Sequence, residues 1–108
     1  MSDIRLIKGF ISDRSVYIND ERLHPFKSQR LRNHSPDGFN WGYTGSGPAQ
    51  MALALLLQIA GERFALEHYH KFKFEVIAGL AQGQDFILDE KLVLAWIQRE
   101  IDHEKKGG

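Results

Sequence analysis

The start of the chain carries the hydrophobic pattern of short β-strands. Residues 4–10 and 15–18 are rich in Ile, Leu, Val, Phe and Tyr, and the polar residues 12–14 separate them. Two such runs around a polar breaker are typical of a β-hairpin. The polar residues 19–21 indicate a further turn, after which residues 22–23 would open a third short strand.

The middle of the chain shows helical spacing instead. Residues 48–60 are apolar on nearly every side, which predicts a helix buried over most of its surface. Pro48 suits the first turn of this helix, because proline lacks the backbone N–H that has no partner there, and Gly61 suits its end. A second helix is predicted over residues 64–80, with charges on one face and these apolar residues on the other: Ala65, Tyr69, Phe72, Val76 and Leu80.

The last predicted helix starts after Asp89, a residue type that caps helix N-termini, and it runs to about Ile101. Its buried stripe would consist of Leu92, Val93, Trp96, Ile97 and Ile101. In the preceding helix, Phe74 departs from the pattern because it lies on the polar face. An aromatic side chain in that position is a candidate anchor for an interface, including that of a homodimer.

These elements predict an α+β fold, in which a small N-terminal antiparallel β-hairpin or three-stranded sheet is followed by a long loop and three helices. A chain of 108 residues is expected to form one domain. A short strand is expected near residues 30–32, and residues 86–88 indicate a short apolar link or strand. The predicted parts are a β-hairpin region, a basic and glycine-rich loop, a helical part and a frayed tail, over residues 1–23, 24–47, 48–103 and 104–108. Loops as long as this one often carry function.

The composition excludes several classes of protein. The chain has no cysteine, which rules out a disulfide framework, a thiolate zinc site and cysteine catalysis, and which fits a cytoplasmic protein. The first five residues lack the basic-then-apolar pattern of a secretory signal. The longest apolar run, residues 51–59, is far shorter than the roughly 20 residues of a membrane span, so no membrane association is expected.

Charge is balanced over the whole chain but not locally. The 14 basic and 14 acidic residues give a net charge of zero and no global attraction to nucleic acid. Residues 22–35, however, contain no acidic residue and include Arg22, Lys27, Arg30 and Arg32. This basic segment precedes the aromatic and glycine residues of the same loop, so we treat them together as one candidate binding surface.

The glycine-rich turn, residues 42–47, lies directly before the first long helix. Its G-x4-G spacing resembles a phosphate-binding loop, but Pro48 and Ala49 stand where such a loop needs Lys and Ser or Thr. Ser46 also lacks the outer glycines of a nucleophile elbow. The turn therefore predicts no nucleotide hydrolysis and no catalytic residue. It is either a structural strand-to-helix turn, or an anion or ligand site at the free N–H groups of the helix start.

The histidines do not form a metal site in the predicted secondary structure. His68 and His70 have the spacing of a ligand pair in a strand, but residues two apart on a helix point about 200° apart. We therefore predict no metal and no cofactor, and we place both histidines at the helix surface. His24 and His34 lie in the basic loop, where surface exposure or pH-responsive packing is expected.

Three functions remain open. The first is a small non-catalytic binding module that contacts a protein partner through the basic loop and the turn. The second is a nucleic-acid-binding accessory protein that uses Arg30, Arg32 and the loop aromatics. The third is a small anion or ligand binder, or an enzyme, at the helix N-terminus. The candidate binding residues for these hypotheses are Arg30, Arg32, His34, Trp41, Tyr43, Gly45, Ser46 and Gly47.

Residues 33–57 form a long and specific string, NHSPDGFNWGYTGSGPAQMALALLL. It resembles the hallmark of a family of small prokaryotic proteins of unknown function, in which Gly-Phe-x-Trp-Gly-Tyr-x-Gly-Ser-Gly-Pro-Ala-Gln precedes an Ala- and Leu-rich helix. Segments similar to residues 68–80 and 86–97 follow in that family, so the resemblance covers most of the chain. It implies no activity or substrate, but it implies that the turn is a defining feature of the family.

Overall fold

The computed structural model describes residues 5–107, so Ile4 of the first predicted strand and Gly108 of the predicted tail lie outside the described residues. The elements follow in the order β1 (Leu6–Phe10), β2 (Ser15–Ile18), β3 (Glu21–Leu23), α1 (Phe26–Leu31), α2 (Ser46–Ala60), α3 (Glu62–Glu75), the 3-10 helix η1 (Ile77–Gly79), β4 (Phe86–Asp89) and α4 (Glu90–Gly107). A sheet and a set of helices are both present, and the predicted α+β class is confirmed.

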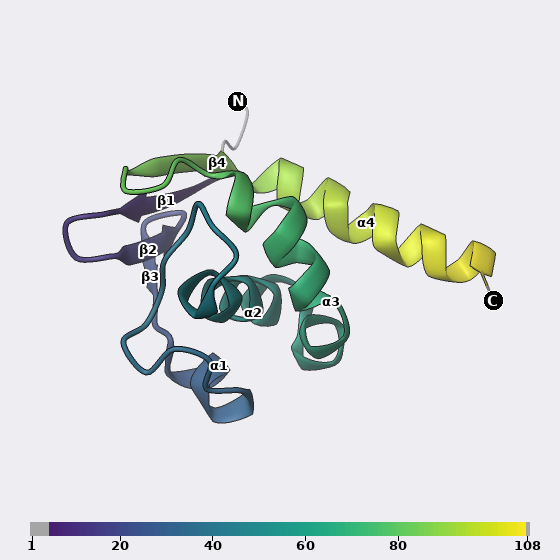
Figure 1. Cartoon of the computed structure of the whole chain (residues 1–108). Coiled ribbons are helices and arrows are strands. Elements are labelled where there is room, and N and C mark those ends of the chain that lie inside the picture. The colour runs from purple at the N-terminus through teal and green to yellow at the C-terminus, as the bar shows by residue number, and fades with distance from the viewer. Residues whose placement is uncertain (1–4, 108) are drawn as a thin grey trace.

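Four strands form one antiparallel sheet in the order β3-β2-β1-β4 (Figure 1). The first three follow the predicted strand pattern. The fourth comes from much later in the chain and pairs with β1, so that Phe86 lies opposite Gly9. A side chain at Gly9 would collide with the Phe86 ring, which lies over that position. The sheet therefore has four strands instead of the two or three predicted. The fourth, β4, lies within the predicted helical part, residues 48–103.

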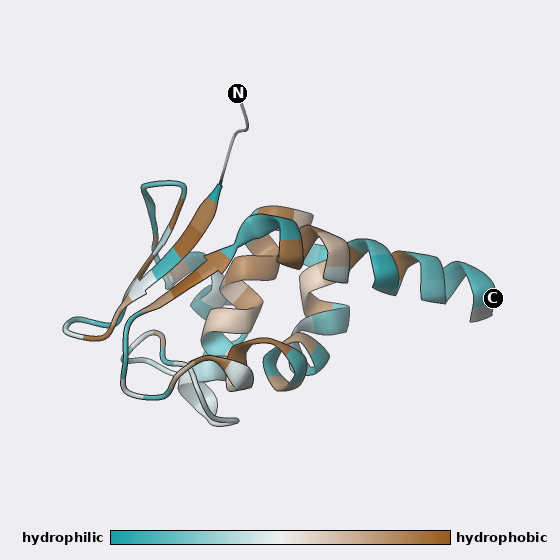
Figure 2. Ribbon diagram, turned by 90° about the horizontal axis from the view of Figure 1, so that it is seen from above, coloured by the Kyte–Doolittle hydropathy of each residue, from teal (hydrophilic) through white to brown (hydrophobic). Residues whose placement is uncertain are grey.

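The helix α2 occupies the centre of the hydrophobic core. Its residues from Gly47 to Leu56 are all buried, and the helix packs against α3 on one side and beneath the sheet on the other (Figure 1). Figure 2 shows hydrophobic residues along the strands and the central helices, whereas the far half of α4 is mostly hydrophilic. The expectation of a helix buried on most of its sides is confirmed, because its sequence offers almost no polar residue to face water.

The first half of the predicted loop is not irregular chain. Residues 26–31 form α1, where the sequence predicts loop and a strand near residues 30–32. This helix has only six residues, and the one residue it buries is the polar Ser28. It therefore shows no helical repeat of apolar residues in the sequence. The helix α2 also begins at Ser46, two residues before the predicted start at Pro48.

The other two helices also differ from the prediction at their ends. The helix α3 stops at Glu75 and η1 follows it, so the predicted second helix is divided before Leu80. The last helix continues to Gly107, and the predicted frayed tail is therefore helical as far as the structure describes it. Leu92 does not belong to the buried stripe of that helix, because it is 63% exposed.

A single buried side chain fastens the loop that contains α1 to the core. Gln50, in α2, is 0% exposed, and its Oε1 accepts the backbone N–H groups of His34 (2.8 Å) and Ser35 (3.0 Å). Its Nε2 donates to Ser28 Oγ (2.8 Å) and to the Arg32 carbonyl (3.1 Å). The amide thus has four partners spread over the loop, and it holds α1 and the residues after it against α2.

Replacing Gln50 with leucine, a similar-sized apolar residue, tests this role. The Gln50→Leu variant should lose roughly 1–3 kcal/mol of unfolding free energy, because the part-buried Ser35 N–H loses its acceptor, the Ser28 hydroxyl loses its donor, and His34 keeps only its bond to the Arg32 carbonyl. Urea unfolding measures this loss. Gln58→Leu, at an exposed position of the same helix, should change the stability by less than about 0.5 kcal/mol. Equal stabilities for the two variants would contradict the assignment.

Candidate functional site

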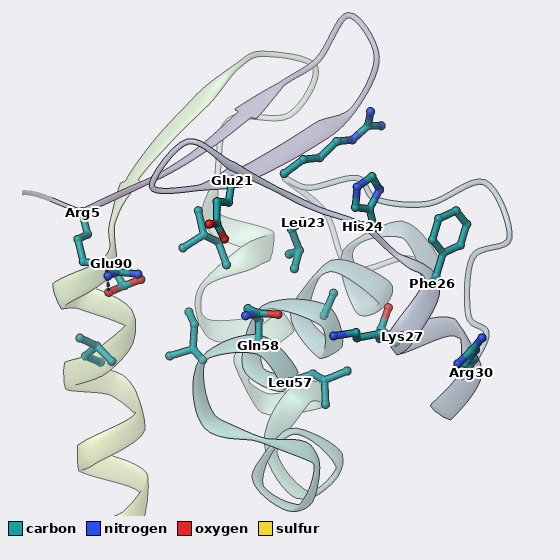
Figure 3. Close-up of a pocket in the computed structure, with 16 residues that line it drawn as sticks. Arg5, Glu21, Leu23, His24, Phe26, Lys27, Arg30, Leu57, Gln58 and Glu90 are labelled. Carbon is teal, nitrogen blue, oxygen red and sulfur yellow. Dashed lines mark ion pairs between the residues drawn. The ribbon is translucent and has the colours of Figure 1, made fainter.

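A cleft of about 750 Å³ opens where β2, β3 and α1 meet the second half of α2 (Figure 3). Arg5, just before β1, and Glu90, in α4, lie at one end, and Phe26 and Arg30, in α1, lie at the other. Leu94 of α4 also lines the cleft. The volume falls within the range of roughly 300–1,000 Å³ that is typical of ligand pockets. The cleft is therefore large enough to hold a ligand or several side chains of a partner.

The floor of the cleft is apolar. Its side chains come from the sheet and from α2, and they are Ile18, Leu23, Ala54, Leu57 and Ile59. Two large apolar side chains of the walls are exposed to solvent, Phe26 at 66% and Leu94 at 46%. The Phe26 ring stacks on His24, with 5.9 Å between the ring centroids and 8° between the planes. Apolar surface is thus available both at the bottom of the cleft and on its rims.

Charged side chains surround this apolar floor. Lys27 and Glu21 point into the cleft, whereas Arg30 stands at its outer edge (Figure 3). Arg22 also contributes to the lining. Within residues 5–107, neither Lys27 nor the two arginines form an ion pair. Their charges are therefore available to a ligand.

A partly buried ion pair closes one end of the cleft. Arg5 Nε lies 2.9 Å from Glu90 Oε1, and the Glu90 side chain is 10% exposed. The Glu90 N–H also donates to the Arg5 carbonyl at 3.0 Å. The charges of this pair balance. The other charged residues of the lining are three cations and Glu21, so the lining carries an excess of two positive charges.

The glycine-rich turn packs tightly and lies outside the cleft lining. Gly42 has φ +84°, its N–H donates to the Ile77 carbonyl at 3.0 Å, and a Cβ there would lie 2.6 Å from the Gln82 backbone nitrogen. A Cβ at Gly47 would lie 2.6 Å from the Asn40 Cβ. These two glycines allow backbone segments to approach each other, which favours the structural interpretation of the turn.

The start of α2 offers few donors for an anion. Pro48 has no N–H, and the Ala49 N–H is bonded to the Gly45 carbonyl at 3.1 Å. Only Ser46 and Gly47 keep the free N–H groups of a helix start, and Gly47 is buried. Gly45 lies under the Tyr43 ring. The geometry gives little support to an anion site here.

The two loop aromatics have different positions. Trp41 is 0% exposed, its Nε1 donates to the Gln84 carbonyl at 2.8 Å, and its ring meets Phe86 edge-on at 4.8 Å. It is a core residue, and it offers no surface for the contact predicted from the sequence. Tyr43 is 37% exposed and remains at the surface of the turn.

The structure separates the predicted basic residues. Arg30 lines the cleft, whereas Arg32 does not, although both are exposed. The Arg32 backbone carbonyl accepts a hydrogen bond from the Gln50 side-chain amide. The Arg32 side-chain charge lies near Tyr69, where burial raises the pKa of the hydroxyl and this charge opposes the rise. Arg30 therefore belongs to the cleft and Arg32 does not.

His34 forms a link between the loop and α3. Its Nε2 lies 2.7 Å from the Tyr69 hydroxyl, and burial raises the pKa of Tyr69 although the nearby Arg32 charge opposes this shift. His70 lies against the Tyr69 ring, with 4.1 Å between the ring centroids, and edge-on to His34 at 5.9 Å. Loss of hydration lowers the pKa of His70, and Lys73 and His34 lower it further. The cluster thus links the loop to α3.

The two neighbouring histidines of α3 point in different directions, as their helical spacing predicts. His70 is exposed and faces His34, whereas His68 is stacked on Phe64 at 4.2 Å and contacts Glu104 of α4. His68 is not the solvated surface residue that the sequence predicts, because only 12% of its side chain is exposed.

Sequence reasoning found part of the cleft and missed the rest. Arg30 is the one residue of the lining that the sequence predicts as a binding residue, and Arg22, His24 and Lys27 belong to the predicted basic segment. The lining residues that the sequence does not indicate include Glu21, Leu57 and Leu94, from other elements. A signal existed for Lys27 and Arg30, since residues three apart share one face of a helix, but only if α1 is recognised.

A family model described as a family of unknown function (DUF6166) matches residues 8–99. The chain belongs to this family. The matched part of this DUF6166 chain contains the glycine-rich turn, Gln50 and all of the cleft lining except Arg5. Comparison with the curated proteins and with the solved structures finds no match. Among the described helices, none combines the length and the apolar character needed to cross a bilayer.

The lowered pKa of His70 predicts that a His70→Gln variant loses less stability in acid than the wild type does. The folded protein holds His70 below the ordinary value of 6.5, so the unfolded chain binds the proton more readily. Stability should therefore fall as the pH drops below 6.5 towards the folded pKa. His70→Gln should remove this part of the loss, so that the variant gains stability relative to the wild type as the pH decreases. Urea unfolding at several pH values checks this, and parallel stability curves would contradict it.

Proposed function

We propose that this DUF6166 protein is a non-catalytic, cytoplasmic binding module whose cleft holds an acidic and partly apolar segment of a protein partner. The observation that carries the proposal is the combination found in the cleft: an apolar floor, exposed apolar rims, and unpaired cations around them. The contact surface is thus the cleft, and the glycine-rich turn lies outside its lining.

The apolar floor favours a peptide segment over a purely polar ligand. Leu57 and Ile59 are only partly covered by the chain itself, and Phe26 and Leu94 stand exposed on the two walls. Burying such surface against apolar side chains of a partner stabilises a complex by about 25 cal/mol per Å². A contiguous exposed apolar surface with a polar rim is also typical of interaction sites.

The charges favour an acidic partner. Lys27 points into the cleft and Arg30 stands at its outer edge, both from the exposed side of α1 (Figure 3). Neither has an ion-pair partner in the described part of the chain. Carboxylates of a bound segment would supply those partners and would speed association at low ionic strength.

The nucleic-acid hypothesis has less support from the same observations. Stacking on bases needs exposed aromatic rings, and Trp41 and Phe39 are buried at 0% and 4% exposure. Phe26 is exposed beside Arg30 and could stack on a base. A charged phosphate backbone, however, has no apolar groups to fill the apolar floor of the cleft. Nucleic acid is therefore an alternative outcome of the test.

The experiment is a selection of displayed random peptides against the full chain, with binding then measured by titration. Enriched peptides should combine Asp or Glu with Leu, Ile or Phe, and NMR shifts on binding should gather at residues such as Leu57 and Lys27. In the double variant Lys27→Glu, Arg30→Glu, the affinity should fall by about 10-fold or more, since each contact pair is worth on the order of 1 kcal/mol.

The matched control is the double variant Lys91→Glu, Lys105→Glu, which changes the net charge equally at exposed lysines outside the cleft lining. It should bind the selected peptides as the wild type does. The proposal fails if no peptide is enriched, if the shifts map elsewhere, or if both double variants lose affinity equally. Retardation of DNA or RNA that depends on Arg30, without peptide binding, would favour the nucleic-acid alternative.

A further inference from the structure

A second group of ionisable side chains lies away from the cleft, where α3 faces the far half of α4. It consists of Glu67 and His68 of α3 and Glu104 of α4, and one ligand atom of each lies within 4.8 Å of the others. We propose that these three side chains bind a divalent transition-metal ion, such as zinc, and that the ion fixes α4 against α3. Imidazole nitrogen and carboxylate oxygen are ligands that zinc takes in proteins.

His68 is the residue on which this site depends. Its Nε2 is buried and forms no hydrogen bond within the described residues. Glu104 Oε1 is only 2.7 Å from that nitrogen, so the oxygen must lie well off the direction of the ring N–H. A buried polar atom without a hydrogen bond is unfavourable, and a metal ion on the free electron pair of Nε2 would satisfy it.

The spacing of the three ligand atoms suits a tetrahedral ion after small movements. Bonds of about 2.1 Å at the tetrahedral angle separate two ligand atoms by about 3.4 Å. Nε2 of His68 lies 2.7 Å from Glu104 Oε1 and 3.9 Å from Glu67 Oε2, so the observed distances fall on both sides of that value. The two carboxylate side chains are 53% and 51% exposed and can rotate to adjust.

The surroundings hold the His68 ring in place. Its Nδ1 faces Glu100 Oε1 at 4.0 Å, and that buried carboxylate is held in place by Lys71 Nζ at 2.8 Å. Histidine ligands commonly have a carboxylate in this position. Phe64 stacks on the ring at 4.2 Å and fixes its plane.

The nearby cations leave the ligand oxygens available. Arg63 contacts Oε1 of Glu67 at 3.4 Å, so Oε2, the oxygen that faces His68, is not the one engaged. Lys71 contacts Glu100. Within the described residues, Glu104 forms no ion pair with a lysine or an arginine. The site therefore keeps two carboxylates whose charges can balance a divalent ion.

A metal ion bound here would hold the far half of α4, which has few apolar contacts to the rest of the chain. The far half of α4 extends away from the sheet (Figure 1), and it is mostly hydrophilic (Figure 2). Its buried apolar residues end at Ile97, beyond which Ile101 is only partly covered. A bond between Glu104 and His68 through an ion would hold this segment where apolar contacts are few.

The test uses the full chain without an affinity tag, stripped of metal with a chelator. Titration with Zn²⁺ near neutral pH should show one ion per chain, and Co²⁺ should give the visible absorption of a tetrahedral site. Glu104→Gln should weaken Zn²⁺ binding at least by the roughly 10- to 100-fold that loss of an outer-sphere partner costs. His68→Gln should abolish it. Zn²⁺ should also raise the melting temperature of the wild type and not that of Glu104→Gln.

His103→Gln and His70→Gln serve as controls, because they remove neighbouring histidines on α4 and α3 that lie outside the cluster. Both should bind Zn²⁺ as the wild type does. Glu104 is exposed, so its substitution leaves the fold intact and keeps the test decisive. The proposal is overturned if the wild type takes up no ion at one per chain, if Glu104→Gln binds as tightly as the wild type, or if a control variant loses binding.

Discussion

The side-chain amide of Gln50 is the interaction on which the arrangement around the cleft depends. One end of it accepts two backbone N–H groups, and the other donates to a hydroxyl and a carbonyl, all within the loop that carries α1. A side-chain amide offers two donor hydrogens and an acceptor oxygen on adjacent groups, and burying them is favourable only when they are hydrogen-bonded. The short helix α1 has little apolar surface of its own, so this network sets its position over α2.

The glycine-rich turn makes this network possible. Gly42 and Gly47 let the chain approach η1 and Asn40 closely enough that α2 can begin at Ser46. Gln50 then lies one turn into the helix, below the loop. With Ser28 held against Gln50, the opposite side of α1 turns Lys27 and Arg30 outwards to the cleft. The turn and the cleft are therefore connected through Gln50 and α1.

Much of the fold could be predicted from local pattern, and the errors have physical causes. The hairpin, the buried helix and the amphipathic helix have enough residues to show their period. β4 has only four residues and pairs with a strand some eighty positions earlier, a contact that no local pattern contains. Trp41 and Phe39 follow a basic stretch, and a sequence alone does not distinguish aromatics that stack on a ligand from aromatics that fill a core. The candidate site was found only in part, since Glu21, Leu57 and Leu94 come from three separate elements.

The helix α4 contributes to both of the proposed sites. Leu94, near its start, stands on the wall of the cleft, and Glu104, near its end, faces His68 of α3. Both positions belong to one continuous helix, Glu90–Gly107, whose apolar attachment is confined to its first half. Leu94 lies between the buried residues Val93 and Trp96, so the first half of the helix already fixes the wall of the cleft. A contact between Glu104 and His68 acts instead on the far half, where apolar contacts are few. The two proposed sites therefore use one helix but depend on different parts of it, and a substitution at one should leave the other unchanged.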